Sequence, residues 1–181
     1  MTFEKMGLSP RLLTALAAEG LTEPTAIQAK AVPTALEGRD VMGLAQTGTG
    51  KTLAFGLPVL HRLMSEKAKP EAKTARALIL APTRELARQI MTSLAPYTKG
   101  TPLSLNLVVG GGSISAQVNK MRRGTDVLVA TPGRLIDLLD RKAVRLDRTR
   151  FLVLDEADQM LDMGFIHALR RIAKLIPTER Q

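Results

Sequence analysis

The feature that most constrains the fold is a series of five apolar runs, each followed directly by a polar or glycine-rich stretch. The runs are DVMGL (40–44), ALILA (77–81), LNLVV (105–109), DVLVA (126–130) and FLVLD (151–155). They are continuously apolar and do not alternate with polar residues, which is typical of strands that are buried on both faces of a parallel sheet. The sequence therefore predicts five buried parallel strands.

Helical spacing of apolar residues fills the chain between and before these runs. The first expected helix carries Ser9 as N-cap, Pro10 at its first position and Gly20 after its end, whereas residues 66–73 predict a solvated loop. Strand and helix in alternation predict a doubly wound α/β domain, with a mostly parallel central sheet and helices on both faces. The expected helices cover residues 9–20, 25–36, 51–64, 84–95, 114–122 and 133–140.

The polar stretches after the strands are expected to lie together. Carboxyl ends of parallel strands share one edge of the sheet, where open α/β folds bind ligands. Structural turns would be divided between both edges, so unusual stretches after every strand predict a binding site at this edge. The stretches are AQTGTGKT (45–52), PTRELA (82–87), GGGS (110–113), TPGR (131–134) and DEAD (155–158).

The stretch AQTGTGKT matches the phosphate-binding loop of nucleotide-binding proteins, with Ala45 at the position of the first glycine. Gly48 and Gly50 allow successive backbone N–H groups to point at phosphate oxygens. Lys51 supplies a charge for the β and γ phosphates, and the Thr52 hydroxyl can ligate Mg²⁺. The helix that begins here adds the positive end of its dipole. This loop predicts binding of a nucleoside triphosphate.

Adjacent carboxylates close the last strand. Asp155 is positioned to hold Mg²⁺, and Glu156 to orient or deprotonate a water molecule. Guanine specificity is rejected, because the nearest string to an Asn-Lys-x-Asp element, residues 119–122, lacks the aspartate. The carboxamide of Gln28 can accept and donate a hydrogen bond at once, which matches the N6 and N7 edge of adenine. We therefore expect ATP and Mg²⁺ as ligands.

Charge and composition indicate the partner. The net charge of +9 suggests a polyanion. One tyrosine, four phenylalanines and no tryptophan leave few surfaces for stacking bases, so contacts to the sugar-phosphate backbone are expected. The absence of cysteine excludes disulfides and thiolate metal sites. His61 and His167 are read as surface or packing residues. No apolar run has the length of a membrane span, and we expect a cytoplasmic protein without membrane contact.

Taken together, the motifs GLTEPTAIQ, AQTGTGKT, PTRELA, GG, TPGR and DEAD, in that order, resemble the DEAD-box ATP-dependent RNA helicases over essentially the whole chain. The stretch DMGFIHALRR (162–171) is similar to the bacterial RhlE-like subgroup. The resemblance implies a RecA-like domain over residues 32–181, preceded by a glutamine-motif segment over residues 1–31. It also implies a second RecA-like domain of the same full-length protein, absent from this chain.

The resemblance assigns further site residues. Gln28 would read adenine, with Phe3 packed by the base and Thr25 in support, while Asp158 would couple the nucleotide to the second domain. An aromatic residue is expected before the paired glycines, where this chain has Val109. Nucleotide-binding residues would be Ala45, Gln46, Thr47, Gly48, Thr49, Gly50, Lys51 and Thr52, and RNA-binding residues Pro82, Thr83, Arg84, Gly110, Gly111, Thr131, Pro132, Gly133 and Arg134.

Three functions stay open at this point. The first is the ATP-binding half of an RNA helicase, which we expect to be monomeric in isolation. Alone it should be nearly inactive, because phosphoryl transfer of this type generally needs an arginine delivered from a facing domain. The second is a DNA translocase of the same superfamily, against which the glutamine motif and Asp158 argue. The third is an adenine-nucleotide or RNA-binding module without catalysis.

Overall fold

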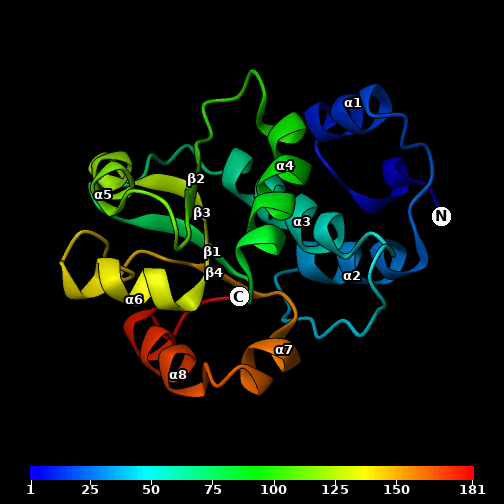
Figure 1. Ribbon diagram of the computed structural model, residues 1–181. Coiled ribbons are helices and arrows are strands. Elements are labelled where there is room, and N and C mark those ends of the chain that lie inside the picture. The colour runs from blue at the N-terminus through cyan, green and yellow to red at the C-terminus, as the bar shows by residue number, and fades with distance from the viewer. The chain divides into compact units, whose positions relative to one another are not determined.

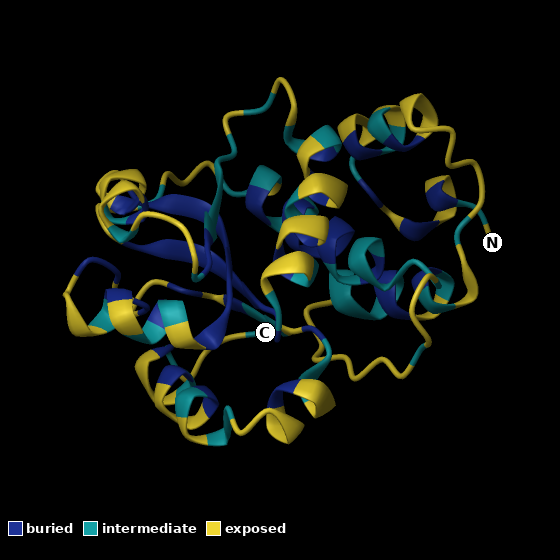
Figure 2. Cartoon of the chain, viewed as in Figure 1, coloured by how far each residue is buried: buried dark blue, intermediate teal, exposed yellow.

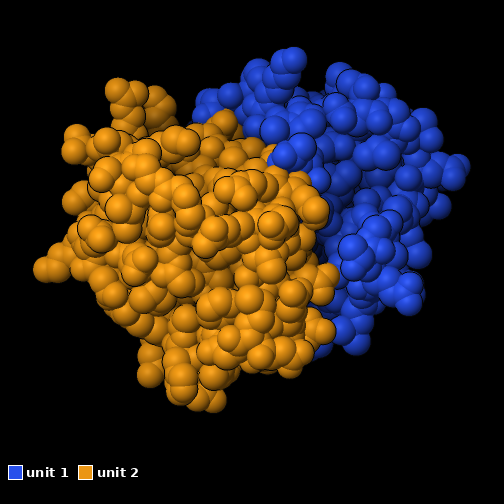
Figure 3. Space-filling view, viewed as in Figure 1, with its two compact units in different colours: residues 1–67, 92–102, 181 blue, residues 68–91, 103–180 orange.

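The computed structural model describes all residues, 1–181, and divides into two compact units (Figure 3). Unit 1 comprises residues 1–67, 92–102 and 181, and unit 2 comprises residues 68–91 and 103–180. No helix of the chain is both long enough and apolar enough to cross a membrane.

Unit 2 is built on a four-stranded, all-parallel sheet in the order β2-β3-β1-β4 (Figure 1). Leu78 of the central strand β1 is in register with Leu128 of β3 and Leu152 of β4. Every residue of β1 and β3 is buried, as their continuous apolar character predicts (Figure 2). The predicted α/β fold is confirmed. The strands are β1 (Ala75–Leu80), β2 (Leu105–Val108), β3 (Thr125–Ala130) and β4 (Phe151–Leu154).

Helices of unit 2 bury one face of this sheet in an apolar core. Leu78 and Leu128 pack there with Leu135 and Leu138 of α6, and with Ile172 of α8. Each fully buried leucine or isoleucine contributes about 1.5–3 kcal/mol. The sequence analysis did not predict α7 or α8. The helices are α5 (Ile114–Met121), α6 (Pro132–Asp140), α7 (Ala157–Asp162) and α8 (Ile166–Leu175), together with the first part of α4 (Arg84–Thr98).

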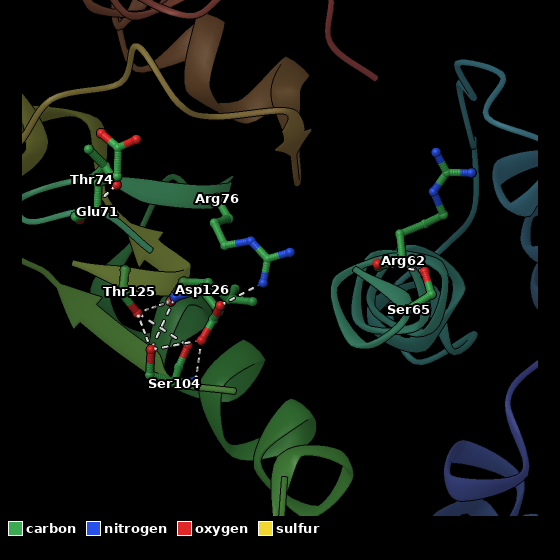
Figure 4. Close-up of polar contacts among 9 residues, drawn as sticks. Arg62, Ser65, Glu71, Thr74, Arg76, Ser104, Thr125 and Asp126 are labelled. Atoms are coloured by element: carbon green, nitrogen blue, oxygen red, sulfur yellow. Dashed lines mark hydrogen bonds and ion pairs between the residues drawn. The ribbon is translucent and has the colours of Figure 1, made fainter. Parts of the chain in front are cut away.

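A buried ion pair fixes the amino-terminal part of the sheet (Figure 4). Arg76 of β1 donates to Asp126 of β3 at 2.8 Å, and the two side chains are only 9% and 4% exposed. The other carboxylate oxygen of Asp126 accepts from the backbone N–H and the hydroxyl of Ser104, at 2.8 and 3.1 Å. A buried charge is tolerated only when it is paired and hydrogen-bonded in this way. The network therefore favours one register of β1 against β3.

Unit 1 is helical. Ser9 caps α1 by accepting from Leu12 N–H, Pro10 is the first helical residue, and Gly20 follows the helix with φ +74°; the predicted start and stop signals are confirmed. Thr25 and Gln28 form a capping box at the start of α2, in which each side chain binds the other residue's backbone N–H. The helices are the 3₁₀-helix η1 (Phe3–Met6), α1 (Pro10–Ala18), α2 (Ala26–Leu36) and α3 (Lys51–Ser65).

The prediction of a strand at residues 40–44 is wrong. This segment has no regular structure and pairs with no strand. Its apolar side chains are exposed, with Val41, Met42 and Leu44 at 44%, 87% and 90%. An apolar run becomes a strand only when a neighbouring strand supplies its hydrogen bonds, and this segment has no such neighbour.

Candidate functional site

The loop at residues 45–50 has the backbone of an anion-binding loop. Gly48 and Gly50 adopt left-handed φ angles of +81° and +84°, which glycine reaches without steric cost. The loop makes a turn at residues 47–48, and the Thr49 hydroxyl donates back to Gln46 O at 2.6 Å. Successive N–H groups around left-handed glycines, directly before a helix, form the kind of concavity that binds phosphate.

The glutamine-motif residues contact this loop directly. Gln28 is 4% exposed and donates from Nε2 to Gly50 O at 3.1 Å, while its Oε1 accepts from Thr25 N–H at 3.0 Å. A Cβ on Gly50 would lie 2.4 Å from Gln28 Nε2 and 3.0 Å from Thr25 Oγ1. Glycine is therefore required at position 50 for two reasons: the left-handed φ angle and the close approach of Gln28 and Thr25. The sequence predicts Gln28 and Thr25 at the adenine, but it does not predict their contact with the phosphate loop.

Phe3 belongs to the same unit and is buried, with 4% exposure. It begins η1, which packs on α2, the helix that carries Gln28. Lys51 and Thr52 form the first turn of α3 and are half-buried. Unit 1 thus contains all the residues assigned to the nucleotide except Asp155 and Glu156.

In unit 2 the polar stretches follow the carboxyl ends of all four parallel strands and so share one edge. Backbone hydrogen bonds continue the sheet into them: Thr131 N–H donates to Val108 O at 3.1 Å, and Asp155 N–H donates to Leu80 O at 2.9 Å. Of the five stretches predicted to meet at one edge, these four do so, whereas residues 45–52 follow no strand. The four stretches are residues 82–87, 110–113, 131–134 and 155–158.

The acidic stretch combines a buried carboxylate with a strained backbone. Asp155 directly follows β4 and is 8% exposed. Glu156 has φ +53° and ψ +51° as N-cap of α7, a left-handed conformation that costs a non-glycine residue about 1–2 kcal/mol. Asp158 is exposed in the first turn of α7. No group of three or more His, Asp or Glu side chains could hold a metal ion unaided, so Mg²⁺ at Asp155 would need further oxygen ligands from a bound nucleotide.

The residues assigned to RNA differ widely in exposure. Arg84, Gly111 and Gly133 are exposed, whereas Thr83, Gly110 and Arg134 are half-buried. The Arg84 guanidinium lies against the two glycines: a Cβ on Gly111 would come 2.4 Å from its Nη1, and a Cβ on Gly110 3.2 Å from its Nη2. These glycines therefore make room for an arginine of the same surface. The buried members of the set are Pro82, Thr131 and Pro132.

Two polar side chains make structural hydrogen bonds that the sequence did not predict. His61 accepts the Ser9 N–H at Nδ1, at 3.1 Å, and so holds the start of α1. Burial first, and then the neighbouring Arg62, lowers the pKa of His61 below 6.5, which keeps the ring neutral and able to accept. Gln117 of α5 is 9% exposed and donates to Val109 O at 2.9 Å. No motif marks either contact: the first joins residues 52 positions apart and the second joins residues 8 positions apart.

With this geometry in view, comparison with known proteins identifies the family. The sequence profile of the DEAD/DEAH box helicases matches residues 25–181. The chain belongs to this family. It is 44% identical over 181 residues to the DEAD-box ATP-dependent RNA helicase CshA of Streptococcus pneumoniae, covering all of this chain and 34% of that protein.

Two further relatives agree. CshA of Listeria monocytogenes, also an ATP-dependent RNA helicase, is 42% identical over 179 residues, covering 99% of this chain and 34% of that protein. The RNA helicase CrhR of Synechocystis is 44% identical over 180 residues, covering 99% of this chain and 35% of that protein. The chain thus spans about a third of the length of these relatives.

Proposed function

We propose that this chain is the ATP-binding part of an ATP-dependent RNA helicase that couples ATP binding and hydrolysis to the unwinding or remodelling of RNA duplexes. The observation that carries the proposal is the phosphate loop of unit 1, in which Gly48 and Gly50 adopt left-handed φ angles directly before α3. Gln28 and Thr25, the residues assigned to adenine, contact this same loop.

Each residue has a distinct part in the proposed reaction. The loop N–H groups and Lys51 bind the phosphates of ATP, and Gln28 accepts and donates to the adenine edge, with Phe3 packed by the base. Thr52 and Asp155 are the residues that would ligate Mg²⁺, which would neutralise charge on phosphate. Glu156 orients the attacking water and accepts its proton. Asp158 transmits the state of the nucleotide to a second domain of the longer protein.

RNA would bind at the carboxyl edge of the sheet in unit 2. Exposed Arg84 contributes charge, and the glycine-rich turn at residues 110–112 exposes backbone to the sugar-phosphate chain. Such contacts read the backbone and not the base sequence. The finer placement in the RhlE-like subgroup is proposed on residues 162–171 alone, since the three relatives described above carry the names CshA and CrhR.

ATPase activity tests the proposal. The full-length protein should hydrolyse ATP faster when single-stranded RNA is added, and the 181-residue chain alone should hydrolyse almost none. Glu156→Gln should preserve ATP binding in the full-length protein and stop hydrolysis. Equal stimulation by DNA and RNA would favour a DNA translocase, and ATP hydrolysis at the normal rate in Glu156→Gln would exclude Glu156 as the residue that positions water.

A further inference from the structure

The glycine-rich turn after β2 is held from two sides by side chains of neighbouring helices. Gln117 of α5 donates from Nε2 to Val109 O at 2.9 Å, immediately before the turn. Arg134 of α6 donates from Nη1 to Gly112 O at 3.1 Å, at the end of the turn. The same Nη1 donates to Gln117 Oε1 at 3.1 Å. One connected network thus spans both ends of the turn.

Both side chains of the network are largely shielded from solvent. Both hydrogens on Arg134 Nη1 are used, its Nε lies 3.9 Å from Asp137, and the side chain is only 14% exposed. Gln117 is buried, and a Cβ on Gly112 would lie 3.2 Å from its Nε2. With 14% of its side chain exposed, Arg134 has little surface left for a ligand, whereas Arg84 is an exposed residue.

Two backbone N–H groups of the turn have no backbone acceptor. The N–H groups of Gly110 and Gly111 donate to no backbone carbonyl, Gly112 closes the turn formed by residues 110–111, and Gly111 has φ +81°. Successive N–H groups around a left-handed residue form a concavity suited to an anion. The carbonyls of Val109 and Gly112 are occupied by side-chain donors, so the N–H groups of Gly110 and Gly111 between them are available to an anion.

We propose that Gln117 and Arg134 are positioning residues that hold the turn at residues 110–112 in the conformation that binds a phosphate of the RNA backbone. Arg134 then acts through the turn and not by direct contact, while Arg84 supplies the charge. The proposal rests on the RNA-binding function proposed above and deepens it: Gln117, which no motif marks, becomes necessary for RNA affinity although it touches no RNA.

The test compares Gln117→Met, Arg134→Met and the double variant in the full-length protein, with Asn119→Met as the control because Asn119 is an exposed amide on the same helix. Binding of fluorescein-labelled oligouridine is measured by anisotropy over a range of KCl concentrations. Each single variant should weaken binding about five- to tenfold, and the double variant no more than the stronger single one, because both remove the same network. The control should bind as the wild type does.

The salt dependence separates positioning from direct contact. If Arg134 only positions the turn, Gln117→Met and Arg134→Met keep the wild-type slope of log affinity against log salt. A slope reduced by about 0.7 in Arg134→Met alone, with losses that add in the double variant, would show that Arg134 contacts a phosphate and would overturn the proposal. Wild-type affinity in Gln117→Met would overturn it as well. If Gln117→Met does not fold, Gln117→Glu is tested in its place. The glutamate keeps the acceptor for Arg134 but loses the donor to Val109, so this variant should still bind RNA more weakly than the wild type.

Backbone order parameters measured by NMR without RNA distinguish failure of this inference from failure of the proposed function. The order parameters of residues 110–113 should be lower in Gln117→Met and in Arg134→Met than in the wild type and the control. Unchanged order parameters would refute the positioning role even if RNA binds. If the wild-type protein binds no RNA but both variants show lower order parameters, the RNA-binding function and the phosphate ligand are refuted, while the role of the network in ordering the turn stands.

Discussion

Alanine at position 50 should destabilise unit 1 more than alanine at position 48. Both glycines are left-handed, with φ +84° and +81°, so each substitution costs about 1–2 kcal/mol in backbone strain. Their surroundings differ. A methyl group on Gly50 would lie 2.4 Å from Gln28 Nε2 and 3.0 Å from Thr25 Oγ1, whereas one on Gly48 would meet no atom within 4 Å.

The additional cost at Gly50 comes from displacing the buried Gln28 side chain. Moving it breaks the hydrogen bonds from its Nε2 to Gly50 O and from Thr25 N–H to its Oε1, each worth about 0.5–1.5 kcal/mol net. Gly50→Ala should therefore lower the free energy of unfolding by about 2–5 kcal/mol, and Gly48→Ala by about 1–2 kcal/mol. The pair is matched, because only one of the two positions has a neighbouring side chain.

Urea unfolding followed by circular dichroism measures the difference. In a Gln28→Ala background the nearest obstacle is absent, so Gly50→Ala should no longer cost the roughly 1–3 kcal/mol of the two Gln28 hydrogen bonds, and the backbone strain and the contact with Thr25 remain. Equal destabilisation by Gly50→Ala and Gly48→Ala in the wild-type background would refute the view that close packing of Gln28 fixes glycine at position 50.

Four further outcomes are expected. Lys51→Ala should abolish ATP binding in calorimetry, and unchanged affinity would contradict the phosphate-binding role. Gln28→Ala should remove the preference for ATP over GTP, and a preserved preference would contradict the reading of adenine. Burial lowers the pKa of His61 in the folded protein below 6.5, so the unfolded chain binds a proton before the folded protein does as pH falls through 6.5. The free energy of unfolding of the wild type should therefore fall in this range, and that of His61→Asn should fall less. Parallel pH profiles of the two proteins in urea unfolding would contradict this. Amides 41–44 should exchange with solvent at nearly unprotected rates, because none has a backbone acceptor, and protected amides would contradict the irregular backbone.

The sequence predicts the secondary structure of a segment well where residues nearby in the sequence determine it, and poorly where a partner distant in the sequence does. The central strands β1 and β3 were predicted because burial on both faces demands apolar side chains throughout. The segment at residues 40–44 has the same composition and is not a strand, since strand formation requires a partner that composition does not reveal. Helix α7 has six residues, too few to establish a helical period.

The same distinction holds for the candidate site. Motifs predicted the phosphate loop and the four stretches of unit 2, because glycines, lysines and carboxylates at fixed spacing within a short segment indicate their chemical role. They did not reveal that Gln28 contacts the loop at Gly50, or that Gln117 and Arg134 tie a turn, because these contacts join residues 22 and 17 positions apart. A single glutamine in a helical sequence does not indicate which distant residue its side chain will hydrogen-bond.

The backbone at Glu156 argues for a chemical role of its side chain. Among non-glycine residues only Lys73, Lys142 and Glu156 have positive φ. Glycine at position 156 would avoid a strain of about 1–2 kcal/mol, and asparagine would lessen it. Position 156 nevertheless holds a glutamate, directly after the buried Asp155 at the carboxyl end of β4. Strain of this kind persists where the conformation serves function, and here the left-handed turn sets the direction of the carboxylate that we propose to activate water.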